Sequence, residues 1–525
     1  MDSQKLFDSQ LIEIFPETRS LDHEQYQALT SDSSLLLVTA GPGSGKTRLL
    51  TYRIAKAIKS GATLANHTLA ITFTRSAARE LRDRLEGLGL EELPHTGTIH
   101  SIALRILKAY WKDTGSSELR VVDSAQALRR YLSYSPSGRA APGLPEGFAV
   151  DDICVEITWK NSSNLSIDKY ITVALEQGRL DATQVTRVGE IMEYYETQKR
   201  YRKVLDFDDI LSHCTHTLES DSEFARRQRW LYQNISLDEM QDLTPLQFRL
   251  IDALRDPVRG NLFCVGDPRQ SIYSWSGASP DLYLGFGPKL QNTHLTYISS
   301  NYRSTPELVS LANSHQVSWM AGSFPQIISR SNLIGQGPKV LEARDETHEV
   351  SLIAALLAKH LGTSHNSGPI AVLARTNKTL ATLRQHLSDS VAGATSSSSL
   401  INCVEFSTLH KAKGKEWDTV IIAGCEDGTV PIVGRSDPDE EARLFYVGIT
   451  RPSRNLYLTF ANSRAGRTCE PSRFLYSMDY NSPDRLASSR VTTDVDELTF
   501  DTQDDLDRWK LDQLSQIRKA LKSQF

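Results

Sequence analysis

The sequence predicts an α/β protein that has two parallel sheets flanked by helices and a helical insertion in the first sheet-forming unit. Apolar runs rich in β-branched residues, each followed by a helix-forming stretch, occur in two sets. The first set lies around Leu35–Ala40, Leu69–Thr74 and Leu262–Gly266, and the second around Ile370–Arg375 and Thr419–Gly424. Because this alternation is typical of parallel strands joined by helices, each set predicts one sheet.

Length and charge narrow the class of protein. The chain has 525 residues, with 59 Lys and Arg against 64 Asp and Glu, which gives a net charge of −5. It is too long for one hydrophobic core, and any nucleic-acid site must be a local basic patch. No window approaches 18 apolar residues and the N-terminus lacks a leader pattern, so we expect a cytoplasmic protein without a membrane span. Six scattered cysteines predict reduced thiols and no structural metal.

Three segments fall outside the strand and helix alternation. Residues 106–204 are rich in polar helix formers and predict the helical insertion, whereas His386–Leu400 is Ser-rich and predicts a surface loop or linker. Apolar residues recur at three-to-five-residue intervals in Leu506–Phe525, which predicts an amphipathic helix. Such a helix more often covers its own protein than docks a partner.

A glycine-rich loop follows the first apolar strand and leads into the helix-forming stretch Arg48–Lys59. A strand, a glycine-rich turn and a helix together point backbone N–H groups at a phosphate chain. Lys46 is placed to reach the terminal phosphates of ATP, and the Thr47 hydroxyl to bind Mg²⁺. The first glycine of the usual GxxxxGK[ST] pattern is Ala40 here. The residues predicted to bind ATP in this loop are Gly41, Gly43, Ser44, Gly45, Lys46, Thr47 and Arg48.

Two adjacent acids, Asp238 and Glu239, end the segment that begins at Trp230. Asp238 is predicted to hold Mg²⁺, and Glu239 to polarise the water that attacks the γ-phosphate. An Asp-Glu pair is usually only the solvated start of a helix. The phosphate loop around Lys46 favours the catalytic interpretation, since it supplies the nucleotide that the acids require.

Ten segments in order resemble the superfamily 1 helicases of the UvrD, Rep and PcrA type, and the resemblance extends over most of residues 21–475. The matching segments are LDHEQ (21–25), AGPGSGKT (40–47), ITFTRSAARE (71–80), TGTIHSIALRIL (96–107), SLDEMQDLTPLQFRL (236–250), VGDPRQSIYSWSGA (265–278), NYRST (301–305), IAVLARTN (370–377), FSTLHKAKGKEWDTVIIAG (406–424) and EEARLFYVGITRPSR (440–454).

The resemblance implies two RecA-like P-loop NTPase domains and an ATP- and Mg²⁺-dependent translocase or helicase. The implied substrate is single-stranded or tailed DNA, and the implied direction is 3′ to 5′. The expected domains are the first RecA-like domain at 1–105 and 205–295, the helical insertion at 106–204, the second RecA-like domain at 296–377 and 404–480, a residual insertion or linker at 378–403, and a polar tail at 481–525.

The resemblance also assigns roles around ATP. It implies that Gln25 reads adenine, that Tyr302 stacks on it, and that Glu416 accepts a hydrogen bond from the ribose. Gln270 is the implied sensor of the γ-phosphate. Arg303 and Arg451 lie in the second sheet-forming unit, so they are expected to reach ATP only when the two units close. Without the surrounding motifs, an ordinary surface ion pair would be an equally good interpretation of each of these arginines.

Aromatic faces and backbone donors are the implied contacts to DNA. Trp275 stands in a polar stretch and is expected to be exposed for stacking on bases, whereas Phe73 could equally be core. The full implied set is Phe73, Thr98, His100, Tyr273, Trp275, Thr408 and His410.

The sequence departs from the family in three places. Relatives carry a folded domain between the strand at Ile370–Arg375 and the segment at 406–424, and here only a helix and a Ser-rich loop fit. Ser276 stands where relatives usually carry Arg. Pro452 follows Arg451, so the helix that precedes Arg451 is expected to end there.

Other functions stay open. The trimmed insertion is compatible with a DNA-sensing ATPase subunit that regulates a protein partner, such as a nuclease or repair factor, as in bacterial anti-phage defence of the Gabija type. A binding module without hydrolysis is disfavoured by the intact set of acids and arginines. A small-molecule kinase is disfavoured because it has no use for arginines in a second unit.

Overall fold

The computed structural model describes residues 21–133, 141–285, 293–320, 324–335, 337–362, 368–391, 404–433 and 437–478. The chain forms two compact units. The first contains the described residues up to Gly41 together with Gly45–Ile298, and the second begins at Ser299 and also includes Pro42–Ser44. The change of unit at Ser299 lies close to the predicted boundary at residue 296.

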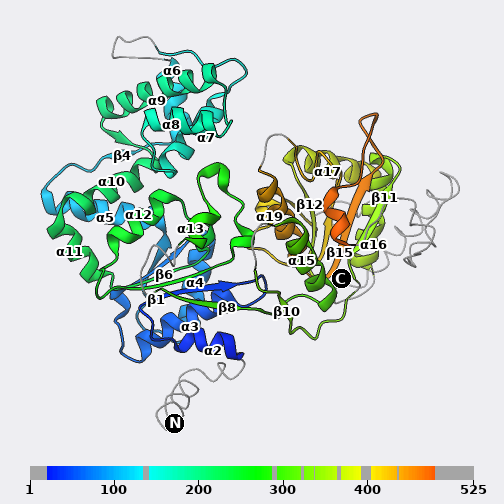
Figure 1. Cartoon of the computed structure of the whole chain (residues 1–525), viewed down its shortest axis with the longest axis horizontal. Coiled ribbons are helices and arrows are strands. Elements are labelled where there is room, and N and C mark those ends of the chain that lie inside the picture. The colour runs from blue at the N-terminus through cyan, green and yellow to red at the C-terminus, as the bar shows by residue number, and fades with distance from the viewer. Residues whose placement is uncertain are drawn as a thin grey trace, which may run out of the picture. The chain divides into compact units, whose positions relative to one another are not determined.

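The first unit is built on a six-stranded parallel sheet with the order β3-β2-β6-β7-β1-β8. Figure 1 labels β1, β6 and β8 of this sheet. The strands are β1 (Leu35–Ala40), β2 (Thr68–Thr72), β3 (His95–Thr98), β6 (Asn234–Leu237), β7 (Asn261–Gly266) and β8 (His294–Ile298). The predicted strand at Leu69–Thr74 ends earlier, at Thr72, because Thr74 caps the next helix by accepting a hydrogen bond from Ala77 N. Phe73 therefore lies just beyond the strand end.

Helices cover both faces of this sheet, as the alternation of side chains along β1 shows. Leu35 and Leu37 pack into one apolar cluster, whereas Leu36 and Val38 pack into another on the opposite face. The first cluster involves α5 (Ile99–Thr114), α10 (Phe207–Ser220), α11 (Ser222–Leu231) and α12 (Pro245–Leu254), and the second involves α2 (His23–Thr30), α3 (Lys46–Lys59) and α4 (Arg75–Gly87).

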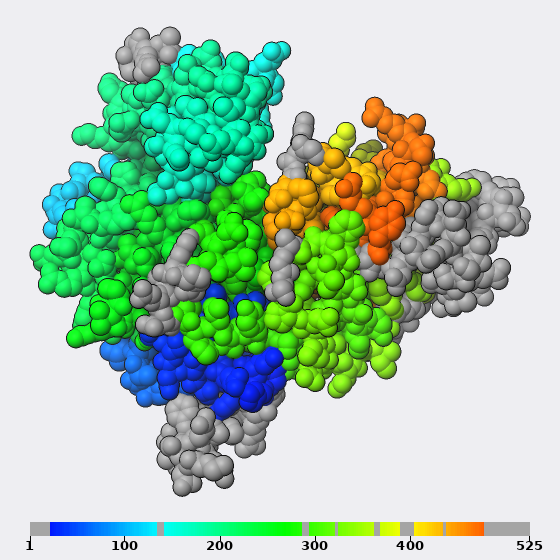
Figure 2. All heavy atoms as spheres, in the orientation of Figure 1, coloured from blue at the N-terminus to red at the C-terminus, as the bar shows by residue number. Residues whose placement is uncertain are grey.

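The helical insertion has a core of its own, made of buried residues such as Leu128, Ile153, Tyr170 and Tyr195. It contains α6 (Ser124–Ser133), α7 (Val150–Ser162), α8 (Ile167–Glu176) and α9 (Ala182–Arg202), and it is bounded by the paired strands β4 (Arg120–Val121) and β5 (Val204–Leu205). In the space-filling view these helices form one lobe that adjoins the sheet-bearing part of the same unit (Figure 2). Helix α5 crosses the predicted start at residue 106 because Leu107 and Trp111 pack into the core of the sheet.

The second unit contains a five-stranded parallel sheet with the order β11-β15-β14-β12-β13. The strands are β11 (Lys339–Ala343), β12 (Ile370–Ala374), β13 (Val404–Thr408), β14 (Trp417–Ile422) and β15 (Pro452–Ala461), and a smaller parallel pair is formed by β9 (Ser300–Asn301) and β10 (Ile328–Ser329). The accompanying helices are α15 (Pro306–Trp319), α16 (Glu346–Gly362), α17 (Asn377–Val391) and α19 (Pro438–Ile449).

The helix of the trimmed insertion and the end of the helix before Arg451 were both expected from the sequence. The helix expected in the trimmed insertion lies inside α17, between β12 and β13. Helix α19 ends at Ile449 and strand β15 begins at Pro452, so the chain leaves helical geometry around Arg451 as the proline requires. The α/β class with mainly parallel sheets is thus confirmed.

Other expectations concern the remaining parts of the chain. The described helices include none that is long and apolar enough to cross a membrane. Within the described ranges, Cys154, Cys214, Cys264, Cys425 and Cys469 are free thiols, and no group of three or more His, Cys, Asp or Glu is arranged to hold a metal. The amphipathic helix expected at residues 506–525 and most of the Ser-rich linker lie outside the described residues.

Candidate nucleotide site and strand-binding face

Three neighbouring strands of the first sheet deliver the predicted nucleotide-binding residues. Strands β6, β7 and β1 are adjacent and parallel, so their carboxyl ends meet at one edge of the sheet. The phosphate loop follows β1, the Asp238–Glu239 pair follows β6, and the segment from Asp267 to Gln270 follows β7. In an open parallel sheet this edge is where ligands bind.

The phosphate loop has the backbone that its glycines permit. Gly45 has a φ of +77° and immediately precedes α3, whose first residue is Lys46. Lys46 Nζ donates to the carbonyl oxygens of Ala40 and Gly41 at 3.0 and 3.1 Å, which places its positive charge inside the loop. Gln25 lies against this turn, since its Nε2 is 3.4 Å from the position that a Cβ on Gly45 would occupy.

The remaining predicted loop residues follow the same turn. Ser44 is 1% exposed, and the Arg48 guanidinium on α3 lies over the Tyr52 ring at 5.2 Å. Gln25 also accepts a hydrogen bond from Asp22 N at 3.2 Å, which closes a capping box at the start of α2. The predicted adenine-reading side chain is therefore held by its own helix as well as by the loop.

Asp238 and Glu239 differ in their surroundings. Asp238 is buried, and its carboxylate accepts from Glu239 N at 3.0 Å and lies 3.5 Å from the Thr47 hydroxyl. Burial and the neighbouring Glu239 raise the pKa of Asp238 to about 7, although Lys46 acts in the opposite direction. Glu239 occupies left-handed backbone, with a φ of +54°, which is uncommon for a residue other than glycine. This strained turn sets the direction of its side chain.

The donor set at this point fits Mg²⁺. A buried carboxylate with a raised pKa gains most when a cation lies beside it, and Asp238 with the Thr47 hydroxyl offers the oxygen ligands that Mg²⁺ prefers. These two residues would hold the ion together with phosphate oxygens of the nucleotide.

Gln241 links the two segments that follow β6 and β7, although no role was expected for it from the sequence. Its Nε2 donates to Glu239 Oε2 at 2.5 Å, and its Oε1 accepts from Asp267 N at 2.9 Å. The close approach needs a glycine at residue 266, because an added Cβ there would lie 2.5 Å from Gln241 Oε1. The only signal in the sequence is the position of Gln241 two residues after Glu239.

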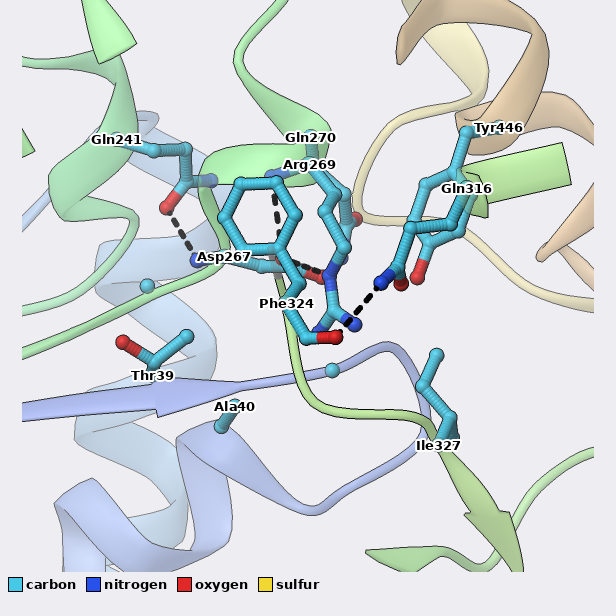
Figure 3. Close-up of polar contacts among 12 residues, drawn as sticks. Thr39, Ala40, Gln241, Asp267, Arg269, Gln270, Gln316, Phe324, Ile327 and Tyr446 are labelled. Carbon is cyan, nitrogen blue, oxygen red and sulfur yellow. Dashed lines mark hydrogen bonds and ion pairs between the residues drawn. The ribbon is translucent and has the colours of Figure 1, made fainter. Parts of the chain in front are cut away.

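Asp267 completes the connection to the predicted sensor (Figure 3). Its carboxylate accepts from Gln270 Nε2 at 2.8 Å and from Arg269 Nε at 2.7 Å, and all three residues are buried. Burial alone would raise the pKa of Asp267, but Arg269 and Lys46 keep that pKa below its usual value. Glu239, Gln241, Asp267 and Gln270 thus form one chain of hydrogen bonds within the first unit.

Residues 301–303 of the second unit meet the tip of the phosphate loop, which belongs to the same unit. Asn301 Nδ2 donates to the Pro42 carbonyl at 2.8 Å, and Tyr302 N donates to the Gly43 carbonyl at 2.9 Å. Gly43 has a φ of +69°, and an added Cβ would lie 2.7 Å from Asn301 Nδ2, so only glycine fits. The Tyr302 side chain is 41% exposed.

The two predicted arginines are both engaged within the second unit. Arg303 forms an ion pair with Glu416 at 2.5 Å, so the structure joins the implied γ-phosphate ligand to the implied ribose acceptor. Arg451 is 3% exposed; its Nε donates to the Val447 carbonyl at 2.9 Å, and its Nη2 donates to the Thr450 hydroxyl at 3.0 Å.

Three of the predicted aromatic residues form a continuous surface. The rings of Phe73 and Tyr273 are nearly parallel at a centroid distance of 6.1 Å, and Trp275 meets Tyr273 edge-on at 6.3 Å. Trp275 is 47% exposed, whereas Phe73 and Tyr273 are partly buried. We call Phe73, Tyr273 and Trp275 the aromatic face.

His100 has an aromatic neighbour that sequence reasoning missed. Phe207, the first residue of α10, is 48% exposed, and its ring lies 6.4 Å from that of His100. Burial lowers the pKa of His100, so its imidazole is neutral at neutral pH. Thr98 caps α5 by accepting a hydrogen bond from Ser101 N at 3.4 Å. The acidic neighbours of Phe207 in the sequence, like the polar neighbours of Trp275, are the signal that could have identified it.

The remaining predicted DNA contacts lie in the second unit. The Thr408 hydroxyl accepts from Lys411 N at 3.4 Å, next to the short helical turn at His410–Ala412. Burial and the nearby Arg375 lower the pKa of His410 to about 4, which leaves a neutral imidazole. Thr408 is the last residue of β13, and His410 lies in the turn that follows it.

Comparison with known proteins places this arrangement in a family. Residues 21–291 match the UvrD/REP helicase N-terminal domain, and residues 296–392 and 390–463 match the UvrD-like helicase C-terminal domain. The chain is 29% identical to the ATP-dependent DNA helicase UvrD2 of Mycobacterium tuberculosis, over 88% of this chain and 82% of that protein. It is 26% identical to a probable DNA helicase of Mycoplasma pneumoniae, over 87% of this chain and 86% of the relative.

A third relative is covered only in part. The chain is 29% identical to the putative ATP-dependent DNA helicase YjcD of Bacillus subtilis, over 69% of this chain and 47% of that protein. The matched domains together span the phosphate loop, the acid pair and both arginine-bearing segments. The chain therefore belongs to the UvrD-like family of ATP-dependent DNA helicases.

Proposed function

We propose that the chain is an ATP-driven translocase on single-stranded DNA that moves 3′ to 5′ and separates duplexes ahead of it. One observation carries the proposal. The segment between Asp267 and Trp275 holds the predicted phosphate sensor, Gln270, at one end and two members of the aromatic face at the other. A shift of Gln270 can therefore change how the aromatic face holds a base.

Hydrolysis follows from the residues at the ends of β1 and β6. Lys46 neutralises charge on the terminal phosphates, and Glu239 accepts a proton from the attacking water. Mg²⁺, held by Thr47 and Asp238, would supply further charge stabilisation on the phosphate oxygens. Gln241 holds the Glu239 carboxylate by the hydrogen bond at 2.5 Å and acts as a positioning residue.

Arg303 and Arg451 are proposed to stabilise the γ-phosphate in the transition state when the second unit closes on the nucleotide. An arginine supplied in this way is worth about 10³–10⁵ in rate. Because Arg303 is paired with Glu416, nucleotide binding must exchange this ion pair for contacts to phosphate and ribose. That exchange couples occupancy of the site to movement of the second unit.

The DNA path is proposed to run over the aromatic face and along His100, with Thr98 at the backbone and with Thr408 and His410 contributing from the second unit. Stacking is worth about 1–3 kcal/mol per base and tolerates any sequence. Phe207 adds a further exposed ring to this set.

A second function is favoured by the short connection between β12 and β13, whose described residues form helix α17 where the family resemblance implies a whole domain. A chain without that domain suits a DNA-sensing ATPase that regulates a partner nuclease, with little unwinding of its own.

We predict that Lys46→Ala and Glu239→Gln each abolish ATP turnover. Glu239→Gln removes the general base, which is worth about 10²–10⁴ in rate, while ATP binding is retained. Steady-state phosphate release and nucleotide binding would be measured together. Glu223→Gln, on an exposed residue of α11 in the same unit, should leave turnover unchanged. Near-wild-type turnover in either site variant contradicts the assignment.

Trp275→Ala is expected to weaken the binding of single-stranded DNA by about 5- to 150-fold, the equivalent of one lost stacking contact. The concentration of DNA that half-maximally stimulates ATPase should rise accordingly, with ATP binding little changed. Trp230→Ala is the matched control, because Trp230 is also exposed in the first unit but packs edge-on against His67. Equal DNA dependence in the Trp275 variant and wild type would remove Trp275 from the path.

A strand-displacement assay with 3′-tailed and 5′-tailed duplexes tests the proposed direction. The translocase should separate the 3′-tailed substrate and leave the 5′-tailed one intact. Separation of neither substrate, alongside DNA-stimulated ATPase, would favour the partner-regulating function. Separation of the 5′-tailed substrate alone would contradict the proposed direction.

A further inference from the structure

A basic groove lies at the base of the helical insertion, between α6, the end of α9 and the strands β4 and β5. Its volume is about 910 Å³, which is large enough for a phosphodiester segment with its sugars. Four of its lining residues are cationic and one is acidic, which gives the lining a net charge of +3 on a chain whose total charge is −5. The charged lining residues are Arg120, Asp123, Arg130, Arg202 and Lys203.

Arg202 lines this groove, and two of its donor atoms have no acceptor among the described residues. Its Nε and Nη2 atoms are buried and have no hydrogen-bond partner there, although the guanidinium lies over the Tyr131 ring at 4.8 Å. Buried N–H groups without an acceptor cost free energy, typically about 1–3 kcal/mol each. The Arg202 guanidinium is also part of the groove lining, and a guanidinium is the group that suits a phosphate best.

A simpler interpretation is that these cations only offset the negative end of the α9 dipole. Lys199 and Arg200 already place positive charge in the last turn of that helix, and Lys199 is paired there with Asp206 at 2.9 Å. The dipole does not account for Arg120 and Arg130, which lie on β4 and α6.

Lys203, another cation of the groove, has an unusual backbone conformation. Lys203 ends α9 with a φ of +52°, a left-handed conformation that glycine or asparagine adopts at lower cost. A lysine at this position instead adds a cation to the groove.

We propose that this groove binds phosphate groups of the nucleic acid on which the protein acts, so the inference rests on the proposed function. Lys203 is joined by β5 to Phe207, four residues later, and four residues span at most about 14 Å. The groove is therefore within reach of a strand that contacts Phe207 and His100. The phosphates belong either to the single strand or to the adjoining duplex.

The test uses the full chain with Arg120→Gln, Arg130→Gln and Lys203→Gln combined. Arg202 is kept because its packing on Tyr131 serves the fold. Binding of a fluorescent single strand and of a 3′-tailed duplex would be measured by anisotropy at several salt concentrations. We expect affinity to fall on the order of tenfold, and the log–log salt dependence to become shallower by about 2 to 3, because each lost phosphate contact removes about 0.7–0.9. Loss on both probes assigns the groove to the single strand, whereas loss confined to the tailed probe assigns it to the duplex.

The matched control removes three exposed cations of the same unit that lie outside the groove, with Lys112→Gln, Lys169→Gln and Arg187→Gln combined. This variant should bind both probes like wild type, and both triple variants should keep the ATPase rate measured without DNA.

Equal affinity and salt dependence in the groove variant and wild type, or equal losses in the two triple variants, would overturn the proposal. Binding of poly-glutamate would be measured on the same variants. If the groove variant lost affinity for poly-glutamate but not for DNA, the proposal would also be overturned, because that result assigns the groove to an acidic protein segment. If wild type binds neither probe, the proposed function itself fails.

Discussion

The buried carboxylate of Asp267 is the interaction on which the proposed coupling depends. It accepts hydrogen bonds from Gln270 and Arg269, while its own backbone N–H is held by Gln241, which also holds Glu239. Gln241, Asp267 and Gln270 are buried and Glu239 is half-buried, and a hydrogen-bonded network of this kind has few alternative arrangements. We propose that a change at one end therefore displaces the other. The parallel order β6-β7-β1 makes the network possible, because it brings three segments that are distant in sequence to one edge of the sheet.

The fold followed from the sequence where local pattern decided structure. The run at Leu35–Ala40 forms β1 with the bounds that were predicted, because an apolar strand ends where the glycines begin. The start of the insertion was less accessible to sequence reasoning. Helix α5 is continuous across residue 106, and only the tertiary contacts of Leu107 and Trp111 show that this helix belongs to the core of the sheet. A change in amino-acid composition can show that an insertion is present. It does not show where the insertion starts when, as in α5, one helix continues across the boundary and packs on the sheet.

Some contacts of the candidate site could be predicted from the sequence, and others could not. Motif spacing predicted that Lys46, Thr47 and Asp238 act together, and the resemblance to the helicase family added Gln270. Within the first unit the structure shows contacts between Thr47 and Asp238 and between Gln270 and Asp267. Spacing could not reveal that Gln241 bridges the two acidic segments, because its partner is a backbone N–H 26 residues away. It also could not reveal that Arg303 is paired with Glu416, since each residue was assigned to a different part of the nucleotide.

We propose that the phosphate state of the nucleotide changes the affinity for DNA through Gln270 and Asp267. The most direct measurement is the affinity of single-stranded DNA with and without a non-hydrolysable ATP analogue, in wild type and in Gln270→Ala. In wild type the analogue should change DNA affinity by about 5- to 150-fold, the usual range for coupled sites. In Gln270→Ala, both ligands should still bind but the change should vanish. Coupling of equal size in the two proteins would contradict the account.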